Sequence, residues 1–268
     1  MKKTLLLFFA TLTLGMAYMD SDIDGVDDMY DKCPQTQLSD LVDYDGCSIN
    51  SDAKELHFDI IFGMGFSQTN YTSQESADTI TTFVQSDFYM DNVTLQAVIS
   101  RYYSDTQDGS GWDDATLSLF YKLPTTETFS LNLLTALIFP TYKSSYGNEA
   151  LDYRAGFDFS YFADEKNYLF GGYNYTFVND SDFGYITYQN TQSLHIGIAH
   201  KPSSDNSYTL SYTTQESIYR DIAAIQTLGV GYSLDMDRHW FMGAYYDYGL
   251  SDSASKHAFS LSIGYFFN

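Results

Sequence analysis

The chain has 268 residues and a formal net charge of −22 at pH 7, with 13 basic against 35 acidic residues. So large an acidic excess argues against nucleic acid as a partner and favours cations. Aromatic residues make up 18% of the chain, yet the mean hydropathy is −0.25. Beyond the N-terminus there is no run of about 18 apolar residues, so a membrane-spanning helix is not expected.

Residues 1–17 have the pattern of a secretory signal peptide. Lys2 and Lys3 supply the positive charge, Leu5–Leu14 the apolar region, and Gly15 and Ala17 the small residues before the cleavage site. No cysteine stands at the cleavage point, so lipoprotein processing is not expected. The mature chain is therefore expected to begin at residue 18 and to be exported.

Residues 18–52 form an acidic segment that holds ten Asp and one Lys. Its first part places oxygen-bearing groups at positions one, three, five, seven, nine and twelve of a loop, with Gly25 at the sharp turn. These groups are Asp20, Asp22, Asp24, the carbonyl of Val26, Asp28 and Asp31. Calcium takes six to eight oxygen ligands in such loops. The spacing predicts a Ca²⁺ site, and the alternative is a disordered acidic linker.

The same segment resembles a thrombospondin type 3 repeat, in the bacterial form found in some OmpA-like outer-membrane proteins. The motifs that carry the resemblance are the Asp-x-Asp-x-Asp-Gly-Val run, Cys-Pro-Gln-Thr at Cys33–Thr36 and Val-Asp-Tyr-Asp-Gly-Cys at Val42–Cys47. The resemblance implies Ca²⁺ as a cofactor and a disulfide between Cys33 and Cys47, which exported chains also favour. It covers a single repeat and does not imply the peptidoglycan-anchoring role of those proteins. An EF-hand is excluded because Asp31, not Glu, stands at position twelve.

Residues 53–268 consist of about twelve segments in which apolar and polar residues alternate. They begin near Glu55, Thr81, Val93, Ala115, Phe129, Asp152, Tyr168, Ser193, Tyr208, Ala224, Trp240 and His257. Each has roughly 9–13 residues, the length that a tilted membrane-spanning strand requires. The sequence therefore predicts an all-β fold, a transmembrane antiparallel up-and-down β-barrel of about 12 strands preceded by a small irregular calcium-binding module.

The connections between these segments alternate between short and long. Short ones are expected at 91–92, 125–127, 164–167, 203–206 and 235–238, and long ones at 67–80, 104–111, 141–150, 179–190, 216–221 and 251–256. Outer-membrane barrels have short periplasmic turns and longer external loops, and a soluble β-sandwich does not require this asymmetry. We expect a barrel in the bacterial outer membrane, in contact with its lipids, with the N-terminal module in the periplasm.

The last segment separates large apolar residues from small ones. One face carries Phe259, Leu261, Ile263, Tyr265 and Phe267, and the other carries Ala258, Ser260, Ser262 and Gly264. This ending resembles the C-terminal signal that the barrel-assembly machinery reads in outer-membrane proteins, from which it departs by the extra Asn268. The resemblance implies that machinery as a partner.

Alternation places a set of charged residues on the expected lumen face. They are Asp59, Asp114, Lys122, Asp152, Arg154, Asp158 and Asp247. Such charges either line a pore or pair into a network that closes it. We expect a narrow channel for small solutes that favours cations; the alternative is a non-conducting structural or surface-interaction barrel. An enzyme is less expected, because no Gly-x-Ser-x-Gly, His-Glu-x-x-His or barrel-phospholipase signature is present.

Overall fold

The fold was analysed in a computed structural model. It describes Val26, Lys32, Cys33, Val42 and Cys47, and residues 57–69, 77–105, 109–126, 128–142 and 149–267. The chain divides into two units, Met1–Lys54 and Glu55–Asn268. The described part of the chain holds no helix of the length and hydropathy that crossing a membrane demands.

The described part of the second unit is built from twelve long strands and one short strand. They are β1 (His57–Thr69), β2 (Ala77–Met90), β3 (Val93–Ser104), β4 (Ser110–Trp112), β5 (Ala115–Thr126), β6 (Phe129–Phe139), β7 (Asp152–Phe162), β8 (Asn167–Phe177), β9 (Thr191–Ser203), β10 (Asn206–Gln215), β11 (Ile225–Asp235), β12 (Trp240–Gly249) and β13 (Ser255–Phe267). The long strands have 10 to 14 residues, enough for a tilted strand to cross a bilayer.

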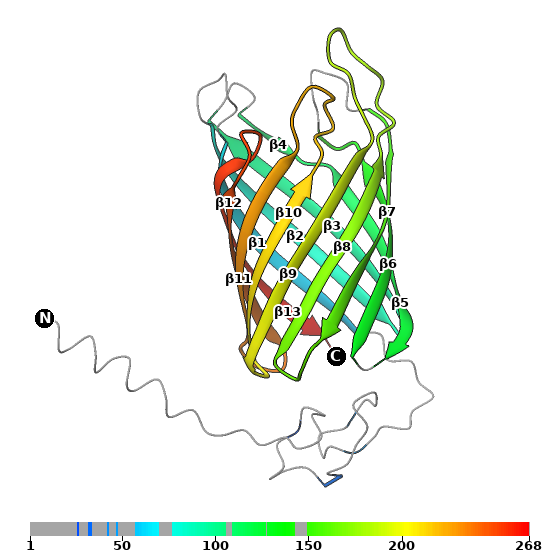
Figure 1. Cartoon of the computed structure of the whole chain (residues 1–268), viewed down its shortest axis with the longest axis vertical. Helices are drawn as coiled ribbons and strands as arrows, with labels where there is room; N and C mark the ends of the chain where they lie inside the picture. Colours follow the sequence, from blue (N-terminus) through cyan, green and yellow to red (C-terminus); the bar gives the residue numbers. More distant parts are fainter. Residues whose placement is uncertain are drawn as a thin grey trace, which may run out of the picture. The chain divides into compact units, whose positions relative to one another are not determined.

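The twelve long strands close into an antiparallel barrel, which confirms the predicted fold (Figure 1). Each pairs with its neighbours in the chain, and β1 pairs with β13, for example at Phe58 and Phe267. β4 adds only a short ladder to β3, in which Arg101 pairs with Trp112. Closure leaves no long strand with an unpaired edge, which is what hydrocarbon requires of a sheet.

The outer face of the barrel is apolar and the inner face is polar or small. On β1, Phe62, Met64 and Phe66 are 57%, 52% and 41% exposed, whereas Gly63 and Gly65 alternate with them on the inner face. Strands that face lipid on one side and a lumen on the other show this pattern. The polar residues Asp59, Ser118 and Thr176 are buried instead.

Short hairpins join the strands at one end of the barrel. Asp91 begins the two-residue turn between β2 and β3 with a φ of 51°, a backbone conformation that tight hairpins require and that Asp tolerates. Asp164 closes the turn after β7 by accepting hydrogen bonds from the backbone of Lys166 and Asn167, both at 2.8 Å. The hydrogen bond from the Asn167 side chain, together with these backbone bonds, lowers the pKa of the Asp164 carboxyl. The short connections thus owe their shape to aspartates that cap their own turns.

The longer connections lie at the other end. The loop after β8 and the loop after β10 are joined by an antiparallel bridge between Tyr188 and Tyr219, whose ring centroids are 5.6 Å apart. One predicted loop was too long. We expected a connection over 67–80, but β1 continues to Thr69 and β2 begins at Ala77. The polar residues at both ends of this range belong to strands, because the ladder between β1 and β2 continues through them, with Ile80 paired to Phe66.

Candidate functional site: the barrel lumen

The lumen is lined by residues that alternate with the exposed apolar ones. Strand pairing carries this assignment round the barrel, because residues directly opposite each other share a face. The charged residues on the inner face of the strands include Asp59, Asp87, Lys122, Asp152, Arg154, Asp158, Asp235 and Asp247, and the ammonium of Lys201 on β9 lies over the ring of Tyr168. Six of them belong to the predicted lumen set. Asp114 lies just before β5, where its carboxylate accepts a hydrogen bond of 3.0 Å from the backbone of Tyr142.

Asp87, like Asp235 at the end of β11, is a lumen carboxylate that sequence reasoning missed. It pairs directly with Asp59 across β1 and β2, and the two residues are only 6% and 4% exposed. Tyr89 donates to one oxygen of Asp59 at 2.8 Å and Gln85 donates to one oxygen of Asp87 at 2.7 Å. The other oxygen of each has no hydrogen-bond partner among the residues that the structure describes. The alternation of Thr79, Thr81, Gln85 and Asp87 was the signal that could have found it.

The acidic residues occur at successive depths along the strands. Asp59 and Asp87 lie near the end with the short turns, and Asp158 is in the body of β7. Asp152 begins β7 at the long-loop end, where it accepts a hydrogen bond of 2.7 Å from the backbone of Asn179. Asp247 lies two residues before the end of β12. Carboxylates are therefore present from one mouth of the lumen to the other.

The basic residues do not neutralise these carboxylates by direct contact. Arg154 hydrogen-bonds to the hydroxyl of Thr176 at 3.2 Å, and neither Arg154 nor Lys122 forms an ion pair with any residue that the structure describes. Within the described lumen, His195 Nε2 lies 3.6 Å from Asp158 Oδ1, a contact that is an ion pair only when His195 is protonated. The structure therefore gives no network of ion pairs across the described lumen.

Several inner side chains lie flat against glycines of a neighbouring strand. These pairs are Phe83 on Gly63, Asp158 on Gly172, Phe170 on Gly197, Asp247 on Gly229, Tyr245 on Gly231 and Phe241 on Gly264. A Cβ at any of these glycines would overlap the side chain that covers it. The glycines thus let bulky groups lie along the wall.

One part of the wall is hollowed into a cavity of about 390 Å³. Its lining includes Asp158, Tyr168, Phe170, His195, Tyr245 and Asp247. They come from β7, β8, β9 and β12. β7, β8 and β9 are direct neighbours in the barrel, and β10 and β11 lie between β9 and β12. The cavity therefore combines aromatic rings, two carboxylates and a histidine from strands that span half of the barrel wall.

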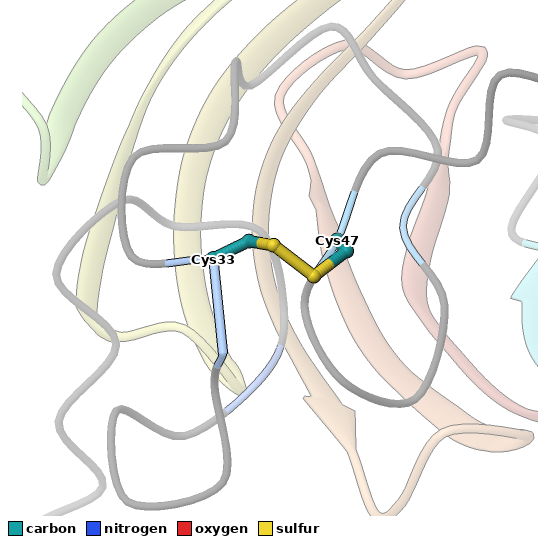
Figure 2. The surroundings of a disulfide bond; sticks show 2 residues. All are labelled: Cys33 and Cys47. Carbon is teal, nitrogen blue, oxygen red and sulfur yellow. A yellow bond between two sulfur atoms is a disulfide. The ribbon is translucent and has the colours of Figure 1, made fainter.

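The first unit carries the predicted disulfide. Cys33 and Cys47 are bonded, with their Cα atoms 5.0 Å apart (Figure 2), so this prediction is confirmed. Val26 is buried. The expected calcium ligands Asp20, Asp22, Asp24, Asp28 and Asp31 lie outside the described residues.

Solved structures with the same fold are outer-membrane channels. The COG4313 outer membrane channel from Pseudomonas putida F1 superposes with a TM-score of 0.63 at 14% identity, over 81% of this chain and 96% of that one. The NanC porin gives 0.54 at 12% identity, over 78% and 98% of the two chains, and the KdgM porin gives 0.51 at 12%, over 78% and 99%. No family model and no curated protein matches the chain in sequence. At these identities the similarity shows the barrel fold alone.

Proposed function

We propose that the chain is an outer-membrane channel for small solutes that passes cations in preference to anions. The observation that carries this proposal is the set of carboxylates at successive depths of the lumen, which Lys122 and Arg154 do not neutralise among the described residues. Rings and series of carboxylates attract cations and repel anions in pores. A bilayer location is supported by the apolar outer face and by the barrel fold that the chain shares with outer-membrane channels.

The dimensions of the wall support a narrow pore. Twelve strands enclose a lumen between that of eight-stranded barrels, which side chains fill, and that of sixteen-stranded porins, which is a wide aqueous channel. In this barrel the glycines under Phe83, Phe241 and Tyr245 keep three large rings close to the wall. A small hydrated solute therefore fits the lumen better than a large one.

The alternative is a barrel with a closed lumen whose loops meet an outside partner. Phe183 and Tyr185 on the loop after β8 favour it, being 56% and 89% exposed. The described lumen, however, holds no network of paired charges that would close it, only the contact between His195 and Asp158. We therefore place the channel first.

Planar-bilayer recording of the purified full-length protein tests the channel. We expect small single-channel steps whose reversal potential in a salt gradient shows cation preference. Asp152→Asn combined with Asp158→Asn should reduce that preference, while Asp221→Asn, which removes a carboxylate from an exposed loop, should not. Absence of steps, or steps that favour anions, would refute the proposal.

We also propose that residues 18–52 bind Ca²⁺ in the periplasm. Support comes from the spacing of Asp20, Asp22 and Asp24, a donor set of the hard oxygens that Ca²⁺ prefers. The disulfide between Cys33 and Cys47 supports it further, because the resemblance to the thrombospondin type 3 repeat implied that bond. Binding would use the carboxylates named above with the carbonyl of Val26, and bound Ca²⁺ would offset the acidic charge of the segment.

A further inference from the structure

The cavity in the lumen wall contains more negative charge than its own side chains can neutralise. Asp158 is 3.6 Å from His195. Asp247 makes no hydrogen bond or ion pair with any described residue, and it is held against Gly229. Neither Lys nor Arg lines the cavity. A half-buried carboxylate without a partner is the kind of group that a ligand with a positive charge satisfies.

The aromatic lining adds a second feature that suits a cation. Tyr168, Phe170 and Tyr245 line the same cavity as the two carboxylates. Aromatic faces attract ammonium groups through their quadrupole, and more strongly where water is partly excluded. At Tyr168 the chain's own Lys201 places its ammonium 5.9 Å from the ring centroid, so Phe170 and Tyr245 are the rings that face a ligand.

The same features argue against other ligands. An anion would meet Asp158 and Asp247, and the ammonium beside the cavity, that of Lys201, lies over the ring of Tyr168 and is not among the lining residues. A bare metal ion would gain little from Phe170. A neutral sugar could stack on the rings, but it would leave the charge of Asp247 without a counterion. An organic cation uses both the rings and the carboxylates.

We propose that this cavity is a binding site for a small organic cation, with an ammonium group directed to Asp247 and Asp158 and its apolar part against Phe170 and Tyr245. The volume of about 390 Å³ suits a small molecule. This inference deepens the proposed channel function, on which it rests for access of the ligand from the lumen. Binding itself is a separate property that can be measured without conduction.

The test compares choline with 3,3-dimethyl-1-butanol, a neutral molecule of the same shape, by calorimetry on the purified full-length protein. Choline should bind at least about tenfold more tightly, because only it satisfies Asp247. Asp247→Asn should weaken choline binding about tenfold, and Tyr245→Leu should weaken it while Tyr245→Phe retains it. The control Asp221→Asn, on an exposed loop, should bind choline as the unaltered protein does.

Three outcomes would overturn the site. They are equal binding of the two molecules, unchanged choline binding by Asp247→Asn, and tight binding of glucose with none of choline. Bilayer recording separates the site from the channel. If the protein binds choline but gives no current, the binding site stands and the channel is refuted. If it conducts without binding choline, the channel stands and the binding site is refuted.

Discussion

The carboxylate of Asp247 lies against Gly229 on the neighbouring strand, so that a Cβ at residue 229 would fall 2.5 Å from Asp247 Oδ1. The other atoms close to that position also belong to side chains, those of Ser211 and Asp247. An added methyl group would therefore turn Asp247 away from the wall without forcing the backbone apart. The position of this carboxylate in the lumen depends on a missing side chain in another strand.

Gly229→Ala should accordingly reduce the single-channel conductance while cation preference is retained, because Asp247 keeps its charge but moves toward the axis. Gly65→Ala is the matched control, since its new Cβ would meet Phe259 O at 3.6 Å and Ser260 Cβ at 3.9 Å, ordinary contacts. Conductance should be unchanged in the control. Equal conductance in Gly229→Ala and the parent would show that Asp247 does not border the conducting path.

The orientation of the barrel can be read from epitope tags. A tag after Gly184, in the loop after β8, should be labelled on intact cells, because this glycine has φ +60° and no atom within 4 Å of an added Cβ. A tag after Glu165, in the short turn after β7, should be labelled only when the outer membrane is opened. The reverse pattern would place the short turns outside and the N-terminal module with them.

The turn aspartates predict a pH dependence of stability. Hydrogen bonds lower the pKa of the Asp164 carboxyl below its ordinary value, and the same holds for Asp237, which accepts from the backbone of His239 and Trp240. A carboxyl whose pKa is lower when folded stabilises the fold above its unfolded pKa, and this contribution is lost as pH falls through the folded pKa.

Asp164→Ala should therefore lower the free energy of unfolding at neutral pH, and the difference from the parent should shrink as the pH falls below the usual range of an aspartate. Urea unfolding followed at several pH values measures this. Glu165→Ala, at the next residue in the same turn, should show no such pH-dependent difference. A pH-independent loss in Asp164→Ala would mean that the charge of the carboxylate is irrelevant to the turn.

Calcium binding is checked by calorimetry on the full-length exported protein after removal of metal by a chelator. Asp22→Ala with Asp24→Ala should abolish Ca²⁺ uptake, because two ligands and two charges are lost together. Asp40→Ala with Asp52→Ala removes the same charge from outside the expected ligand set and should leave uptake intact. Uptake that survives the first pair would assign the ion to other groups.

The strands were predictable because each carries its own signal. In β13 the alternation of Phe259, Leu261 and Ile263 with small residues fixes both the element and its outer face, and no knowledge of a neighbour is needed. The polar ends of the strands were harder to predict, because Thr79 and Thr81 are typical of loops until their pairing with β1 is known. Asp114 directly precedes β5, in the parity of the inner-face residue Ser118, so its place in the lumen stays a prediction.

The cavity was not predictable, because it depends on register between strands far apart in the chain. Asp158 and His195 are brought together by the pairing of β7 with β8 and of β8 with β9, through Gly172 between them. Sequence shows that glycines occupy the inner face. It does not show which side chain from the next strand covers each of them.

The pairing of β1 with β13 also determines when the barrel can form. Phe58 and Phe267 come from opposite ends of the described barrel, so their contact closes a very long loop and makes the ring slow to complete. Until the last strand has been delivered, both β1 and the growing end present unpaired backbone that can join to other chains. A chain shortened within β13 would therefore yield an open and aggregation-prone sheet, not a smaller barrel, and export of the whole sequence is a condition for any insertion.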